Sequence, residues 1–236
     1  MFPRLLALAC AAATAAPAAV VIRQDPADTF KALADKLHST TIDVRSAAPV
    51  TSDAGGSQLE IIAHGTGTLL GGGFAVTTLH AVAVPDPSGK MAPLPHVEVW
   101  VPDHEPIEAR VLAAAPEVDL ALLQLPRSLA ALEGAALAPG PPAEGQPLMA
   151  MGIDEEAVVV VGASVGTVKG DLLSLTGKRM LDSRFWGGPL YDASGKLSGI
   201  VLMSLGPSRA VSAAVIQRML DQRPLSPSPY SHRLEP

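Results

Sequence analysis

Short apolar or alternating segments follow one another along most of the chain, separated by turns that contain glycine or proline. Segments of this kind predict β-strands. The predicted strands cover residues 40–45, 59–70, 74–82, 96–101, 107–115, 118–125, 147–153, 157–170, 171–176, 187–192 and 197–203. Their spacing of about 8 to 12 residues, with glycine turns, favours a sandwich or barrel over a parallel sheet with crossover helices.

Helices and loops interrupt the strand pattern at a few places. Apolar positions at helical spacing predict a short helix over residues 25–38 and a closing helix over residues 210–220. Small and polar residues predict a loop over 46–57, and proline and glycine predict another over 85–95. Residues 126–147 are rich in proline, glycine and alanine, which is typical of a long connection.

Composition agrees with a folded chain that has an aliphatic core. Of the 236 residues, 48% are hydrophobic, 17% are charged and only 3% are aromatic. Such a chain is too apolar to be disordered, and its length suits one large all-β domain or two small domains. The formal net charge of −6 argues against a nucleic-acid-binding surface. Beyond the N-terminus no apolar run is long enough for a membrane span. We therefore expect the protein neither to bind nucleic acid nor to span a membrane.

The N-terminal residues have the pattern of a signal peptide, and the C-terminal residues have the composition of a disordered tail. Arg4 precedes an apolar stretch that ends in small residues with Ala-x-Ala spacing, so residues 1–19 read as a secretory signal peptide. We therefore expect export to the periplasm or the extracellular space; a buried Ala-rich helix and lipidation of Cys10 are the alternatives. Because Cys10 is the only cysteine, the processed chain would have no disulfide, thiolate nucleophile or cysteine-based metal site. Residues 222–236 are rich in proline and predict a disordered tail.

Three segments form a pattern in order along the chain. Residues 65–82 contain a Thr-Thr-Leu-His motif that ends at His80, and residues 117–125 contain an Asp-Leu-Ala-Leu-Leu motif that begins at Asp119. Residues 187–201 begin with Gly-Gly-Pro-Leu. The set resembles the trypsin-like serine proteases, and specifically the bacterial high-temperature-requirement type. The resemblance extends over roughly residues 28–221.

The resemblance implies an all-β fold: two six-stranded antiparallel β-barrels with a short N-terminal helix and a C-terminal helix. The protease domain would cover residues 20–221. Within it we expect the first barrel at about 40–126, the second at about 145–209 and the closing helix at 210–220. The peptide-binding C-terminal module of many such proteases is expected to be absent. The resemblance implies no metal and no organic cofactor, and the six histidines form no metal-binding motif.

The resemblance also assigns roles to a histidine and an aspartate. His80 would be the general base, because imidazole exchanges protons near neutral pH. Asp119 would fix the imidazole tautomer and stabilise its protonated form. Taken singly, His80 is more simply read as a packed core histidine and Asp119 as a residue that caps a strand. Only the joint pattern makes them a remnant base and its orienting acid.

The sequence departs from the family at the nucleophile. Trp186 stands immediately before Gly187 and Gly188, where the family has its serine. Arg184 stands where the family has the glycine of the oxyanion hole, and Phe185 stands where it has asparagine or aspartate. An indole N–H cannot attack a carbonyl carbon, so we expect an inactive homologue.

Two function classes follow from this departure. Arg184, Phe185 and Trp186 could convert the cleft into a site for an extended peptide or protein, since these residue types are common at interface hot spots. Alternatively, Phe185 and Trp186 simply fill the cleft as core residues. The competing class is an active or atypical serine endopeptidase that uses a nearby hydroxyl such as that of Ser183. The sequence leaves the oligomeric state open.

Overall fold

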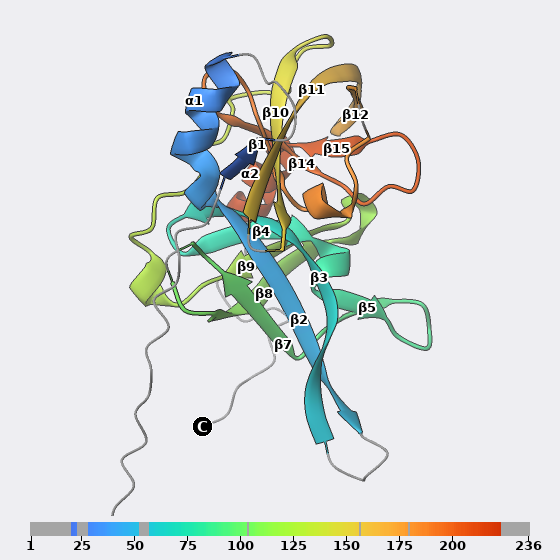
Figure 1. Cartoon of the computed structure of the whole chain (residues 1–236). Coiled ribbons are helices and arrows are strands. Elements are labelled where there is room, and N and C mark those ends of the chain that lie inside the picture. The colour runs from blue at the N-terminus through green and yellow to red at the C-terminus, as the bar shows by residue number, and fades with distance from the viewer. Residues whose placement is uncertain are drawn as a thin grey trace, which may run out of the picture.

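The computed structural model describes residues 20–22, 28–51, 57–102, 104–155, 157–178 and 180–222. Strands dominate and form two closed antiparallel barrels, with a helix toward each end of the described chain (Figure 1). This confirms the predicted all-β, two-barrel fold with its two helices. The predicted signal peptide and the predicted tail beyond residue 222 lie outside the described residues.

The first barrel takes its strands from the N-terminal half of the chain. Its closed order is β2 (Thr41–Thr51), β3 (Ser57–Gly71), β4 (Phe74–Thr78), β9 (Leu120–Gln124), β8 (Ile107–Ala115) and β7 (His96–Trp100). Successive side chains of a strand point to opposite faces, so alternate residues fill the interior. The interior is aliphatic and includes Ile42, Val44, Leu69, Ala75, Val97, Val99, Val111, Ala121 and Leu123.

The second barrel follows the long connection at 126–146. Its strands are β10 (Pro147–Asp154), β11 (Ala157–Lys169), β12 (Leu172–Thr176), β13 (Pro189–Tyr191), β14 (Leu197–Val201) and β15 (Arg209–Ser212). They pair in the order β11-β10-β13-β14-β15-β12, and pairing of β12 with β11 closes the sheet. The short strand β1 (Val20–Ile22) adds to the outside of this ring, parallel to β11.

A shared apolar layer joins the two barrels to the helices α1 (Asp28–Leu37) and α2 (Ala213–Asp221). Its buried members come from both barrels and both helices, and include Phe30, Val76, Leu120, Leu122, Met149, Met151, Leu197, Ile200 and Ile216. The side chain of Ser212 caps α2 by accepting a hydrogen bond from the Ala214 N–H. Because residues of both barrels pack in this layer, it fixes the orientation of one barrel relative to the other.

Short 3₁₀ turns connect several strands within the described residues. They are η1 (His38–Thr40), η2 (Leu79–Ala81), η3 (Pro116–Val118), η4 (Arg127–Leu129) and η5 (Ser183–Phe185). The buried hydroxyl of Tyr191 lies 2.5 Å from Oγ1 of Thr40 and so ties η1 to the second barrel. Burial raises the pKa of Tyr191.

Three sequence predictions need correction. The loop predicted over 46–57 is largely strand, because β2 and β3 pair as far as Thr51 and Ser57 and project as a long hairpin arm (Figure 1). Residues 91–93, which lie in the loop predicted over 85–95, form the strand β6 (Met91–Pro93), and β6 pairs with β5 (Ala83–Pro85). The closing helix begins at Ala213 rather than at residue 210, because residues 210–212 pair with β12 and β14. The second barrel therefore extends to Ser212.

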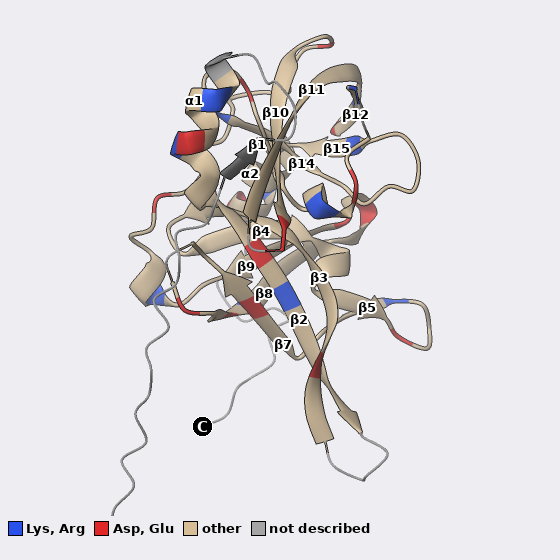
Figure 2. Cartoon of the chain, viewed as in Figure 1, with Lys and Arg blue, Asp and Glu red and all other residues tan. Residues whose placement is uncertain are grey.

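Charged residues are spread over both barrels. In the view of Figure 2, acidic and basic residues are interspersed along the strands and loops, and no continuous basic tract is visible. Among the described residues, neither helix has the length and apolar character to cross a bilayer. The described part of the chain also contains no cluster of three metal-ligating side chains.

Candidate functional site

His80 and Asp119 meet where β4 and β9 begin to separate. The two strands pair from Phe74 with Gln124 to Thr78 with Leu120, so the turn η2 that follows β4 lies beside the residue that precedes β9. The His80 Nδ1 atom lies 2.5 Å from Oδ1 of Asp119, and the His80 backbone N–H donates to the same oxygen at 3.2 Å. The predicted pair is therefore in direct contact.

The backbone of Asp119 holds the carboxylate in this position. Asp119 has φ of 53° and ψ of 43°, a left-handed conformation that aspartate tolerates better than most residues. Its carbonyl accepts the Leu79 N–H at 3.0 Å, while its carboxylate contacts both the backbone N–H and the Nδ1 atom of His80. A residue held in this sparsely populated backbone region is a candidate for a functional role.

The imidazole is more accessible than its partner. The His80 side chain is 44% exposed, whereas that of Asp119 is 18% exposed. If Nδ1 carries the proton that Asp119 accepts, the other ring nitrogen, Nε2, remains an acceptor. The pair can therefore position a base, but a reaction requires a nucleophile next to it.

The loop that carries Arg184, Phe185 and Trp186 is seated on Thr66 of β3. The Trp186 carbonyl accepts the Thr66 N–H at 3.0 Å, and the Arg184 carbonyl accepts the Thr66 hydroxyl at 2.6 Å. The same hydroxyl accepts the Ile153 N–H at 3.1 Å. One threonine thus fixes the carbonyls of Arg184 and Trp186 and the adjoining strand β10.

Every backbone N–H from Arg184 to Gly188 already has an acceptor. The bonds run from Arg184 to the Asp182 carboxylate (3.1 Å), from Phe185 to the Asp182 carbonyl (3.0 Å), from Trp186 to the Ser183 carbonyl (3.3 Å), from Gly187 to the Val201 carbonyl (2.8 Å) and from Gly188 to the Phe185 carbonyl (2.8 Å). In this conformation the loop therefore presents no free backbone donor to a ligand.

The Arg184 side chain ties the loop to itself and to the end of β10. Its guanidinium donates to both carboxylate oxygens of Asp182 and, at 3.0 Å, to Asp154 at the end of β10. These hydrogen bonds, first to Asp182 and then to Asp154, raise the pKa of Arg184. Bidentate guanidinium–carboxylate pairs are strong and geometrically specific.

Gly187 and Gly188 allow the loop to approach the strands beneath it. Gly187 has a φ of 86°, and a Cβ atom there would overlap the Thr66 carbonyl oxygen. A Cβ atom at Gly188 would overlap the Met151 carbonyl oxygen. Both positions therefore require glycine.

The aromatic side chains face the core of the second barrel. Phe185 is only 4% exposed and belongs to the buried cluster of that barrel, and Trp186 is partly buried against the same cluster. The Trp186 Nε1 atom is buried without a hydrogen-bond partner among the described residues. Phe185 is thus a core residue and does not offer an interface contact.

Gly65 of β3 links the two parts of the site. A Cβ atom at Gly65 would lie 3.1 Å from the Ala81 Cβ and 3.4 Å from the Trp186 carbonyl oxygen. Ala81 is the neighbour of His80 in η2, so η2 and the Trp186 backbone flank one glycine. The structure therefore brings the predicted His80, Asp119 and Trp186 into one region.

Ser183 is the first residue of η5. It is exposed and lines a cavity of about 260 Å³ with Arg45, His64 and Asp154 between the barrels. In the part of the chain that the structure describes, its hydroxyl makes no hydrogen bond to His80.

Sequence reasoning missed Thr66 and Asp182. Asp182 had a usable signal, because aspartate before a short helical turn is a preferred N-cap, and it does cap η5. Thr66 lies inside the Gly-Thr-Gly segment of β3 and has no comparable signal.

The comparisons with known proteins agree with this fold. A family model described as "Trypsin-like peptidase domain" matches residues 65–200, more than half of the chain. The chain therefore belongs to the trypsin-like peptidase family. Among curated proteins, no sequence matches.

Solved protease structures share the fold at low sequence identity. The active form of the Rv3671c protease from M. tuberculosis matches with a TM-score of 0.67 and 18% identity, over 96% of this chain and 100% of that chain. An inactive form of Rv3671c with a serine-to-alanine mutation matches with a TM-score of 0.63 and 19% identity, over 91% and 99%. The serine endoprotease from Yersinia pestis matches with a TM-score of 0.64 and 17% identity, over 84% and 67%.

Proposed function

We propose that this chain is an exported, catalytically inactive trypsin-like peptidase homologue of the high-temperature-requirement type that binds extended peptide segments beside its former active site. Trp186 would occupy the nucleophile position, with His80 and Asp119 as the remaining base and orienting acid. The observation that carries the proposal is the closed loop, in which every N–H from Arg184 to Gly188 has an acceptor within the protein. The signal-like residues 1–19 support export.

Two requirements of amide hydrolysis would be missing at once. The indole of Trp186 offers no nucleophile, and loss of the nucleophile of a catalytic triad costs about 10⁶ in rate. The residual activity of such a variant depends on oxyanion-hole donors. At Arg184 and Trp186 the corresponding N–H groups are engaged by Asp182 and Ser183.

Peptide binding is supported by exposed apolar side chains near η5. Met180, Met203 and Leu205 are all exposed, and Leu205 is 96% exposed. They lie in two loops joined through Ser208, whose side chain accepts the Leu181 N–H at 2.7 Å. Clustered apolar side chains on a surface mark interaction sites, and an extended peptide can add main-chain hydrogen bonds at a strand edge.

A fluorophosphonate probe tests the loss of catalysis. We expect no covalent labelling of the protein, and no cleavage of β-casein, because no hydroxyl of the described residues is hydrogen-bonded to His80. The measurement is intact-mass spectrometry after incubation, with trypsin as the positive control. Labelling that disappears in both Ser183→Ala and His80→Ala would instead establish the atypical endopeptidase.

Binding of β-casein tests the proposed peptide site. We expect Met203→Glu to weaken binding by about tenfold, because a charge replaces an apolar contact. Leu172→Glu is the matched control, since Leu172 is also exposed but lies on β12. Fluorescence anisotropy of labelled β-casein gives both affinities, and equal weakening by the two variants would argue against a site at these loops.

A further inference from the structure

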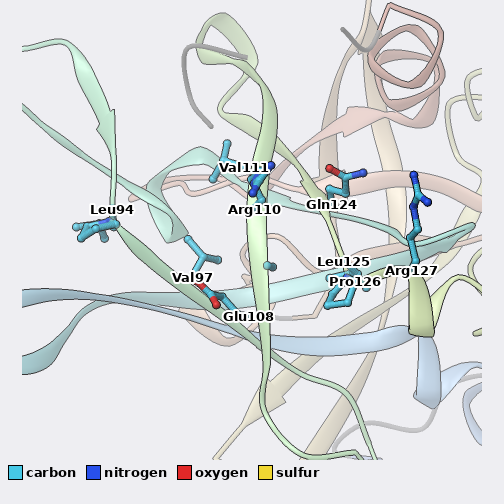
Figure 3. A pocket seen from close by; sticks show the side chains of 11 residues that line it. Leu94, Val97, Glu108, Arg110, Val111, Gln124, Leu125, Pro126 and Arg127 are labelled. Atoms are coloured by element: carbon cyan, nitrogen blue, oxygen red, sulfur yellow. The ribbon is translucent and has the colours of Figure 1, made fainter. Parts of the chain in front are cut away.

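A second cavity lies on the first barrel, away from the residues of the candidate site. Figure 3 shows the side chains that line this cavity. The volume of the cavity is about 380 Å³. The lining residues come from the segment before β7, from β8 and from the end of β9: Leu94, Pro95, Val97, Glu108, Ala109, Arg110, Val111, Gln124, Leu125, Pro126 and Arg127. The size falls in the range of small-molecule sites, about 300–1,000 Å³.

The cavity arises where β8 changes partners. β7 pairs with β8 from Ile107 to Ala109, whereas β9 pairs with β8 only from Arg110 onward. On the β9 side, β8 therefore has no strand partner before Arg110, and β8 and β9 diverge between Ala109 and Arg110. The cavity lies at this divergence, because its lining includes residues from the start of β8 and the end of β9.

Its lining combines an apolar base with a polar rim. Leu94, Val97, Val111 and Leu125 are buried, as is Ala109. Arg110 and Gln124 are direct partners across β8 and β9, so their side chains share one face. In Figure 3, Arg110, Gln124 and Arg127 extend to the same side of the cavity.

Among the described residues, the two arginines at this cavity have no ion-pair partner, unlike three other arginines. Arg45, Arg184 and Arg218 each form an ion pair, whereas Arg110 and Arg127 form none with any described residue. Two unpaired guanidiniums at one cavity are notable in a chain of net charge −6. A guanidinium prefers a carboxylate, which it can bind through two parallel hydrogen bonds.

Glu108 limits the charge that the cavity can accept. It lies two residues before Arg110 on the same strand, yet no ion pair joins them in the described part of the chain. With two cations and one anion at the rim, the cavity suits a ligand with one negative charge better than a polyanion.

We propose that this cavity binds a single carboxylate carried on an apolar body. The carboxylate pairs with Arg110 and Arg127, the Gln124 amide donates to it, and the apolar body covers Val97 and Leu125. A free aliphatic or aromatic acid and the C-terminus of a peptide ending in an apolar residue share this chemistry.

The test is an NMR titration of the full-length ¹⁵N-labelled protein with 4-phenylbutanoate and with its neutral analogue 4-phenylbutanamide. We expect saturable shifts at the amides of Ala109, Val111 and Leu125, and binding of the amide weaker by about tenfold or more. The double variant Arg110→Gln/Arg127→Gln should lose binding to a similar extent. Arg209→Gln on β15 removes one exposed cation from the other barrel and should bind as the wild type does.

The same titration separates the two sources of the carboxylate. Acetyl-Ala-Ala-Phe with a free C-terminus, compared with its C-terminal amide, represents a peptide end. Tighter binding of this peptide than of 4-phenylbutanoate identifies a chain end, and the reverse identifies a free acid. Equal binding of the acids and their amides, or shifts that avoid β8 and β9, would overturn the proposal.

Discussion

We expect Gly187→Ala to lower the free energy of unfolding by about 4 kcal/mol, as the sum of backbone strain and overpacking. Gly187 has a φ of 86°, which favours glycine, and its neighbours leave no room for a methyl group. An added Cβ would overlap the Thr66 carbonyl oxygen and lie 2.7 Å from the Thr77 hydroxyl. The first is a backbone atom of β3 and the second is a buried hydroxyl that donates a hydrogen bond to it, so the loop would have to lift off β3. Urea denaturation followed by circular dichroism measures the effect.

Gly145→Ala is the matched control for this substitution. Gly145 has a φ of 80°, but a Cβ atom there would meet nothing within 4 Å. We therefore expect only the conformational cost, about 1–2 kcal/mol. If both variants lose the same stability, then the 183–188 loop is not pressed against Thr66 as described.

The contact between His80 and Asp119 could be anticipated because it depends on a strand pairing that the sequence indicates. Each residue adjoins an apolar strand, and the resemblance joins the two strands. What the sequence could not indicate is the left-handed backbone of Asp119. That conformation depends on η3 and on the Leu79 N–H bond, which exist only in the folded barrel.

The errors in the strand prediction have local causes. Residues 46–57 are small and polar, and propensity assigns them to a loop, but β2 and β3 pair along this whole arm up to Thr51. Residues 210–212 fit the apolar spacing of the helix that follows them. Pairing with β12 and β14 overrides that preference, and Ser212 then starts the helix as its cap. Tertiary pairing outweighs local preference in both cases.

The closed state of the η5 loop was not predictable from the sequence. In the proposed function Arg184, Phe185 and Trp186 replace the family's catalytic residues, but their identities do not say where the N–H groups of the loop point. That depends on the Asp182 cap, on Thr66 from β3 and on the ion pair with Asp154 from β10. These partners lie up to 118 residues away in sequence.

We expect Trp186→Ser alone to leave the protein unreactive toward a fluorophosphonate, although it introduces a hydroxyl at the proposed nucleophile position. The Arg184 N–H stays with Asp182, the guanidinium still ties the loop to Asp154, and Phe185 still anchors it in the core. The triple variant Arg184→Gly/Phe185→Asp/Trp186→Ser removes both anchors. We expect it to react faster than the single variant by about 10²-fold or more, the effect of one oxyanion donor.

Adding His80→Ala to the triple variant provides the control, because labelling that depends on the pair of His80 and Asp119 must then disappear. Stopped incubations resolved by intact-mass spectrometry give the rates, and circular dichroism confirms that each variant is folded. Equal reactivity of the single and triple variants would mean that only the missing hydroxyl prevents reaction. A difference between them would show that the loop has lost the oxyanion site as well as the nucleophile, so that two independent changes separate this chain from a working peptidase.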